Sequence, residues 1–126
     1  MKKNKKRLHY AVTQKIWGSF KVLYQGETLI NSNEAIELTE FYNGKNLKPV
    51  IYFPRDSGIE KLICKEEKTS FCPIKGIASY WSYKEATNCI WSYEKPIKEV
   101  SLIKGYYSFY EDKGFKIIRS QLFKRL

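Results

Sequence analysis

The chain has 126 residues, of which 43% are hydrophobic and 16% aromatic, and it carries a formal net charge of +10. A chain of this length has the size of one domain and buries roughly two thirds of its unfolded surface, so it needs neither metal nor disulfide to fold. Its apolar runs are far shorter than the roughly 20 residues of a membrane-spanning helix, and no apolar segment follows the basic N-terminus as in a secretory signal. We therefore expect a cytoplasmic protein without membrane contact.

The positive charge is concentrated at the two ends. Five of the first seven residues are Lys or Arg, and Lys124 and Arg125 lie at the other end. Without these seven cations, 16 basic and 13 acidic residues remain, a balance of only +3. We expect basic tails over residues 1–7 and 120–126, which make weak contact with polyanions, on a single β-rich domain over residues 8–119.

In chain order, the first half of the sequence indicates short strands separated by turns. Phe20–Tyr24 and Thr28–Ile30 are rich in β-branched and aromatic residues and flank a glycine, which predicts a hairpin. The polar segment Asn31–Asn33 predicts a turn into a further strand over Ala35–Leu38. The pair Asn43-Gly44 predicts another tight turn.

The next elements are a short strand and a helix. Pro49–Pro54 has proline at both ends, and proline cannot donate to a central ladder. Over Ser57–Lys68, apolar residues recur at helical spacing, and Asp56 or Ser57 can cap the first turn. The sequence therefore predicts a mostly β fold: one compact domain of twisted antiparallel sheets with one or two short helices.

A short repeat allows a prediction of strand register, because Trp81-Ser82-Tyr83 recurs as Trp91-Ser92-Tyr93. If Lys84–Asn88 is the loop between two antiparallel strands, Trp81 faces Trp91. Side chains alternate across a sheet, so one face would then carry several large aromatics. The residues expected on this face are Ser79, Trp81, Tyr83, Trp91 and Tyr93. Such a face either packs against a second sheet or forms the wall of a pocket.

The segment Cys72-Pro73-Ile74-Lys75-Gly76 predicts a tight turn that has two chemical interpretations. Proline fixes φ after the cysteine, and glycine permits a left-handed conformation after the lysine. In one interpretation, the Lys75 ammonium stabilises the thiolate of Cys72, which is the reactive form. In the other, the turn holds a buried thiol and a solvated lysine.

Arg55 directly follows the proline-bounded strand, at a strand end from which side chains project. Its guanidinium can bind a carboxylate or phosphate through two parallel hydrogen bonds. It can equally pair with Asp56, Glu60 or Glu111 on the protein surface.

Residue counts argue against several kinds of site. Three cysteines, Cys64, Cys72 and Cys89, do not form a closed set of disulfides, and they lack the close Cys-x-x-Cys pair of a zinc site. The single histidine, His9, lies beside the basic tail, which argues against a cysteine–histidine catalytic pair. Phosphate-binding glycine loops are also missing. We expect neither a metal nor a cofactor.

Several segments in this order resemble a known family. They are Tyr52–Asp56, Cys72–Tyr80, Trp91–Pro96, Ile103–Tyr106 and Phe109–Tyr110. The set is similar to the bacterial and fungal family called domain of unknown function 427, and the similarity spans about Phe20 to Ile118. Ser70-Phe71 stands where the family often has a histidine before the cysteine, and the hairpin between the two tryptophans looks shorter than usual.

The resemblance implies a compact β-rich domain of β-tent-like architecture. That group includes methionine-R-sulfoxide reductases and the thalidomide-binding domain of cereblon. In some of these folds an aromatic cage holds a small ligand, and many members carry a zinc knuckle, whose paired cysteines this chain lacks. Part of the family is filed under a nucleotidyltransferase label, for which the sequence shows no motif.

The leading hypothesis is a small-ligand-binding domain with an aromatic pocket beside the Cys72–Gly76 turn. Aromatic side chains would form the walls, Arg55 and Lys75 would hold an anionic or carbonyl group, and tyrosines would supply hydroxyls. If the protein is an enzyme, Cys72 is the candidate nucleophile, assisted by Lys75. The expected site residues are Tyr52, Arg55, Cys72, Lys75, Tyr80, Trp81, Trp91 and Tyr93.

Two alternatives use the same residues differently. Aromatic strands beside basic tails can bind single-stranded nucleic acid in a salt-dependent way. The aromatic face can also serve as a protein-interaction or homodimerisation surface, because Trp and Tyr are typical of interface centres. Both a monomer and a homodimer are compatible with the sequence.

Overall fold

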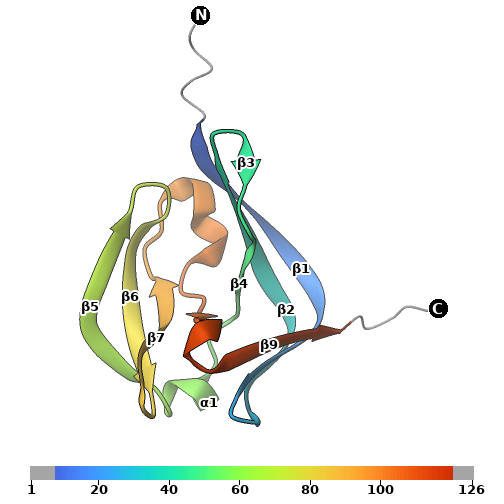
Figure 1. The fold of residues 1–126 in the computed structure, drawn as a ribbon, viewed down its shortest axis with the longest axis vertical. Coiled ribbons are helices and arrows are strands. Elements are labelled where there is room, and N and C mark those ends of the chain that lie inside the picture. The colour runs from blue at the N-terminus through green and yellow to red at the C-terminus, as the bar shows by residue number, and fades with distance from the viewer. Residues whose placement is uncertain (1–7, 121–126) are drawn as a thin grey trace, which may run out of the picture.

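A long hairpin and a smaller sheet lean against each other in the computed structural model, which describes residues 8–120 (Figure 1). The hairpin consists of β1 (His9–Tyr24) and β2 (Glu27–Tyr42). In Figure 1, β5, β6 and β7 lie on one side and β1 and β2 on the other, with the orange segment that holds η2 at one end and α1 at the opposite end. The predicted mostly β fold of antiparallel sheets is confirmed.

Two antiparallel sheets contain all the named strands of the described residues. The first has the order β3-β2-β1-β9, with β4 also paired to β2, and the second has the order β5-β6-β7-β8. The bounds are β3 Lys45–Asn46, β4 Val50–Tyr52, β5 Cys64–Cys72, β6 Gly76–Tyr83, β7 Ala86–Tyr93, β8 Ser108–Phe109 and β9 Phe115–Ser120. Within residues 8–120 there are also three short helices, α1 Ser57–Glu60, η2 Lys98–Ile103 and η3 Glu111–Lys113. None of the described helices is long and apolar enough to cross a membrane.

The domain ends only partly match the expected tails. β9 runs through Ser120, which pairs with Ser19 of β1, so this first residue of the expected C-terminal tail belongs to a sheet. The remaining residues of both expected basic tails, 1–7 and 121–126, lie outside the described residues.

The β1–β2 hairpin forms at the predicted place but is much longer than expected. Gln25 and Gly26 both have positive φ, +50° and +87°, as the tight hairpin turn requires. The turn predicted at Asn31–Asn33 is wrong, because β2 continues through it and Lys21 pairs with Asn31. Pairing with β1 supplies a ladder that outweighs the local turn preference of these polar residues.

The predicted helix over Ser57–Lys68 is wrong beyond its first turn. Asp56 caps α1 as expected, since its carboxylate accepts a hydrogen bond from the Ile59 amide at 2.9 Å. Ile59 is buried, but Leu62 is 55% exposed, so the apolar spacing does not form one buried face. From Cys64 the chain pairs with β6 instead, as the edge strand of the second sheet. Its register shifts between Lys65 and Thr69, which places a bulge in the middle of this edge.

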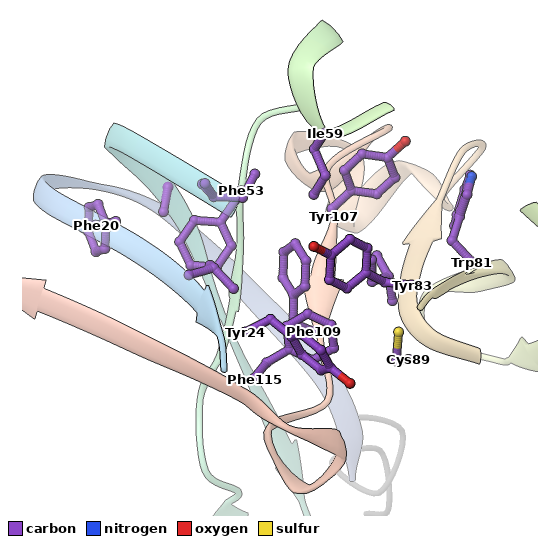
Figure 2. Packing of buried hydrophobic residues seen from close by; sticks show 14 of the residues in the cluster. Phe20, Tyr24, Phe53, Ile59, Trp81, Tyr83, Cys89, Tyr107, Phe109 and Phe115 are labelled. Atoms are coloured by element: carbon purple, nitrogen blue, oxygen red, sulfur yellow. The ribbon is translucent and has the colours of Figure 1, made fainter. Parts of the chain in front are cut away.

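The buried side chains form two clusters, which we call the first and second cores. The first core, most of it drawn in Figure 2, consists of Ile16, Phe20, Val22, Tyr24, Ile30, Ala35, Phe53, Ile59, Trp81, Tyr83, Cys89, Ile90, Tyr107, Phe109 and Phe115. The second consists of Ile36, Leu38, Tyr52, Ala78, Tyr80, Tyr93, Val100 and Ile103. Successive side chains of a strand point to opposite faces. Tyr52 at the end of β4 therefore enters the second core, while Phe53 enters the first.

We predict that Gly114→Ala destabilises the fold more than Gly44→Ala. Both glycines have positive φ, +106° and +81°, which L side chains rarely adopt. A Cβ at position 114 would lie 2.9 Å from Cε1 of the buried Tyr24, whereas nothing lies within 4 Å of one at position 44. Urea unfolding should show a loss of about 1 kcal/mol for Gly44→Ala and an additional 1–3 kcal/mol, roughly, for Gly114→Ala. Equal losses would contradict the close packing around Gly114.

Candidate functional site

The register of β6 against β7 decides which aromatic side chains meet. Tyr80 pairs with Trp91, and Trp81 pairs with Ile90, so the predicted pairing of Trp81 with Trp91 is wrong by one residue. The turn contains only Lys84 and Glu85 in place of the five residues expected. A shift of one residue moves a side chain to the other face. The predicted shared face of Ser79, Trp81, Tyr83, Trp91 and Tyr93 is therefore wrong.

Six aromatic side chains lie in or against the second core, one of them Tyr106. We call the other five the aromatic cluster: Tyr52, Tyr80, Trp91, Tyr93 and Tyr110. The ring centroids of Trp91 and Tyr110 lie 4.5 Å apart, and the Tyr52 ring meets Trp91 edge-on at 6.2 Å. The Trp91 indole Nε1 donates a hydrogen bond to the Tyr52 hydroxyl at 3.2 Å. This bond fixes the orientation of the indole, because a buried indole N–H needs a partner.

Burial raises the pKa of three hydroxyl groups of the cluster. Burial and the neighbouring Tyr80 hydroxyl raise the pKa of Tyr110 to about 12. Burial also raises the pKa of Tyr52 and of Tyr93 far above the ordinary range. The Tyr80 hydroxyl shares a hydrogen bond of 2.8 Å with Ser70 Oγ on β5. This bond gives the Tyr80 hydroxyl a partner, without which it would be costly to bury.

The Cys72–Gly76 segment forms the predicted turn, between β5 and β6. The Lys75 amide donates to the Cys72 carbonyl at 3.1 Å, and Gly76 adopts φ +115°. A Cβ at Gly76 would lie 3.3 Å from the Lys95 carbonyl oxygen, so the segment before η2 also requires glycine here. Cys72 is half-buried against the second core.

The Lys75 ammonium pairs with Glu40 of β2, at 3.4 Å. The same carboxylate also lies 2.6 Å from Nε2 of the His9 imidazole. Partial burial alone would raise the pKa of Glu40, but hydrogen bonds from His9 and Lys75 outweigh this effect and lower it. Three segments distant in sequence are joined here. The sequence interpretation missed both His9 and Glu40, because only the full-length pairing of β1 with β2 brings them to this turn.

Arg55 and Trp81 lie apart from the aromatic cluster, on the first-core side. The Arg55 guanidinium donates to the Gly105 carbonyl at 2.9 Å and to Glu94 at 3.2 Å. It also lies 5.2 Å from the centroid of the Trp81 ring and 4.5 Å from that of Tyr107. Partial burial would raise the pKa of Glu94, but Lys65 and Arg55 reverse this effect and lower it. The Nε and Nη2 donors of Arg55 are thus bound to other groups of the protein.

A groove of about 350 Å³ opens beside Trp91 and Tyr110 at one end of the aromatic cluster. Its lining residues are Lys48, Val50, Ile51, Trp91, Ser108, Phe109, Tyr110, Glu111 and Ile117. Tyr80 and Tyr93 are only 7% and 6% exposed, so they fill the interior of the cluster rather than line a cavity. Of the eight expected site residues, the structure brings together Tyr52, Cys72, Lys75, Tyr80, Trp91 and Tyr93, and Trp91 alone lines this groove.

Within residues 8–120, no three His, Cys, Asp or Glu side chains gather to hold a metal ion.

A family model described as Domain of unknown function (DUF427) matches residues 13–119. The chain belongs to this family. The resemblance inferred from the sequence is thereby confirmed, and the match covers the aromatic cluster, the Cys72–Gly76 turn and the groove. His9 lies before the matched residues. A search of the curated proteins gave no match.

We predict that Arg55→Met lowers the free energy of unfolding more than Lys65→Met. Both cations pair with Glu94 and lie over the Trp81 ring. Arg55 also binds the Gly105 carbonyl and lies over the Tyr107 ring. Its side chain is 31% exposed and that of Lys65 is 54% exposed, so solvent screens both ion pairs. Urea unfolding should show a loss of about 1–2 kcal/mol for Arg55→Met and less than about 1 kcal/mol for Lys65→Met. Equal small losses would show that the additional contacts of Arg55 do not stabilise the fold.

We also predict that Glu40→Gln makes the stability less sensitive to acid. The pKa of Glu40 is lowered in the fold, so its ionised form stabilises the protein above its ordinary pKa of 4.5. This contribution is lost as the pH falls through the folded-state pKa. Unfolding free energies measured from pH 6 to pH 3 should therefore fall less steeply in Glu40→Gln than in the wild type. Glu67→Gln, on the exposed edge strand, serves as the control and should retain the wild-type slope; identical slopes in all three proteins would contradict the assignment.

Proposed function

We propose that this domain binds a small, ring-containing molecule in the groove beside Trp91 and Tyr110. The observation that carries the proposal is the pair of half-exposed aromatic rings, 4.5 Å apart, that lines the groove. Half-buried aliphatic side chains of Val50, Ile51 and Ile117 continue the apolar wall. A volume of about 350 Å³ lies at the small end of the range typical of small-molecule sites.

The indole that would contact the ligand is held in place before binding. Tyr52 is fully buried and accepts the hydrogen bond of the Trp91 Nε1–H, while Tyr110 contacts the indole from another side. A wall that does not need to be ordered on binding loses less conformational entropy when the ligand arrives. This preorganisation favours a binding site over a loosely packed surface.

The structure argues for a different polar side chain, from the two expected, as the one that holds an anionic part of the ligand. The sequence interpretation gave this role to Arg55 and Lys75, but both cations are engaged by carboxylates of the protein. Lys48, in the segment between β3 and β4, lines the groove directly. We therefore assign to Lys48 the contact with a negative or carbonyl group.

The proposal is for binding, without a chemical reaction. Cys72 is half-buried against the second core and is not among the residues that line the groove. The Lys75 ammonium, which would have activated its thiol, is directed to Glu40. A nucleophilic role for Cys72 therefore finds no support in the arrangement of these side chains.

The test is a screen of ring-containing fragments by NMR, monitored at the indole N–H signals of the three tryptophans. Ligands should shift the Trp91 signal, and Tyr110→Ala should weaken their binding about tenfold, the loss of one aromatic contact. Ile117→Trp, which adds bulk to the groove wall, should abolish binding. Trp17→Ala is the matched control, because Trp17 is 65% exposed and lies outside the groove. Fragments that bind both groove variants as tightly as the wild type would refute the proposal.

A further inference from the structure

Two side chains of opposite charge line the groove without a partner. Lys48 precedes β4, and Glu111 is the first residue of η3, so they come from separate segments of the chain. Both are exposed. In the part of the chain that the structure describes, neither side chain makes an ion pair or a hydrogen bond.

Other charged groups described above have partners, in contrast to Lys48 and Glu111. Lys75 and Glu40 pair with each other, and Arg55 and Glu94 do the same. Lys113, near the groove, donates to the Thr87 carbonyl at 2.9 Å while its ammonium lies 5.5 Å from the Tyr110 ring centroid. The groove thus offers one free cation and one free anion beside its aromatic wall.

We propose that the ligand of this groove is a zwitterion that carries a planar ring, of the class of aromatic α-amino acids. This inference rests on the proposed function, and it adds the charge of the ligand. A purely anionic ring compound would pair with Lys48 but would face the repulsion of Glu111. A purely cationic compound would meet the opposite arrangement. A ligand with both an ammonium and a carboxylate pairs with both side chains, while its ring lies against Trp91 and Tyr110.

The experiment compares four compounds that share one ring and differ in charge: L-phenylalanine, 3-phenylpropanoate, phenethylamine and toluene. Binding is measured at pH 7 and low salt from the shift of the Trp91 indole N–H. L-phenylalanine should bind most tightly, and loss of either charge should weaken binding about two- to fivefold, as is typical of an exposed ion pair. Toluene should bind most weakly. High salt should reduce these differences, because exposed charges are screened.

Two single variants sharpen the test. Lys48→Gln should weaken L-phenylalanine and 3-phenylpropanoate but leave phenethylamine no weaker. Glu111→Gln should weaken L-phenylalanine and phenethylamine but leave 3-phenylpropanoate no weaker. Lys61→Gln and Glu67→Gln remove exposed charges outside the groove and should change none of these affinities.

The outcomes separate this inference from the proposed function. If toluene or a singly charged compound binds as tightly as L-phenylalanine, the zwitterion is refuted while ring binding in the groove stands. If none of the four shifts the Trp91 signal, but uncharged fragments of another shape do, the zwitterion again fails alone. If no ring compound binds at all, both proposals fail.

Discussion

The pairing of β6 with β7 is the constraint on which the arrangement of this domain depends. Because side chains alternate along a strand, the pairing of Tyr80 with Trp91 sends these two rings to the second core. The same register sends Trp81 and Ile90 to the first core. The β6–β7 hairpin thus contributes aromatic side chains to both cores. The position of the groove beside Trp91 follows from this register.

The face of this hairpin toward the second core combines large apolar rings with polar groups that form hydrogen bonds. Tyrosine and tryptophan bury much apolar area but leave a polar tip that must be satisfied. Here Trp91 is paired with Tyr52, and Tyr80 with Ser70. The other side uses Arg55 in a similar way, since its charge is neutralised by Glu94 while its guanidinium carbon lies 4.5 Å from the centroid of the Tyr107 ring. Both sets of contacts fix side-chain orientations as well as adding stability.

The sequence predicted the features that depend on local chemistry. The hairpin turn at Gly26, the turn at Asn43-Gly44 and the turn from Cys72 to Gly76 all form, because their residues favour positive φ or fix the backbone. The β6–β7 register was missed for a related reason. Lys84 begins that turn with φ +51°, and nothing in a lysine signals a left-handed turn. The longer loop that the repeat suggested therefore placed Trp81 on the wrong face.

The parts of the site that could not be predicted depend on contacts between distant residues. His9 and Glu40 meet Lys75 only because β1 and β2 pair along their whole length. Local spacing likewise could not show that Arg55 would form an ion pair with Glu94, which follows it by 39 residues. By contrast, six of the eight expected site residues do gather on one side, because strand alternation and the Cys72–Gly76 turn bring them together.

The bulge in β5 has a consequence for how copies of this protein behave in solution. β5 is the open edge of the second sheet, and such an edge exposes backbone groups that can recruit another strand. The bulge interrupts that edge where Lys65, Glu66, Glu67 and Lys68 follow one another. An incoming strand would meet both an irregular backbone and a row of charges that it would have to desolvate. This stretch of the edge therefore resists the edge-to-edge stacking that starts β-aggregation.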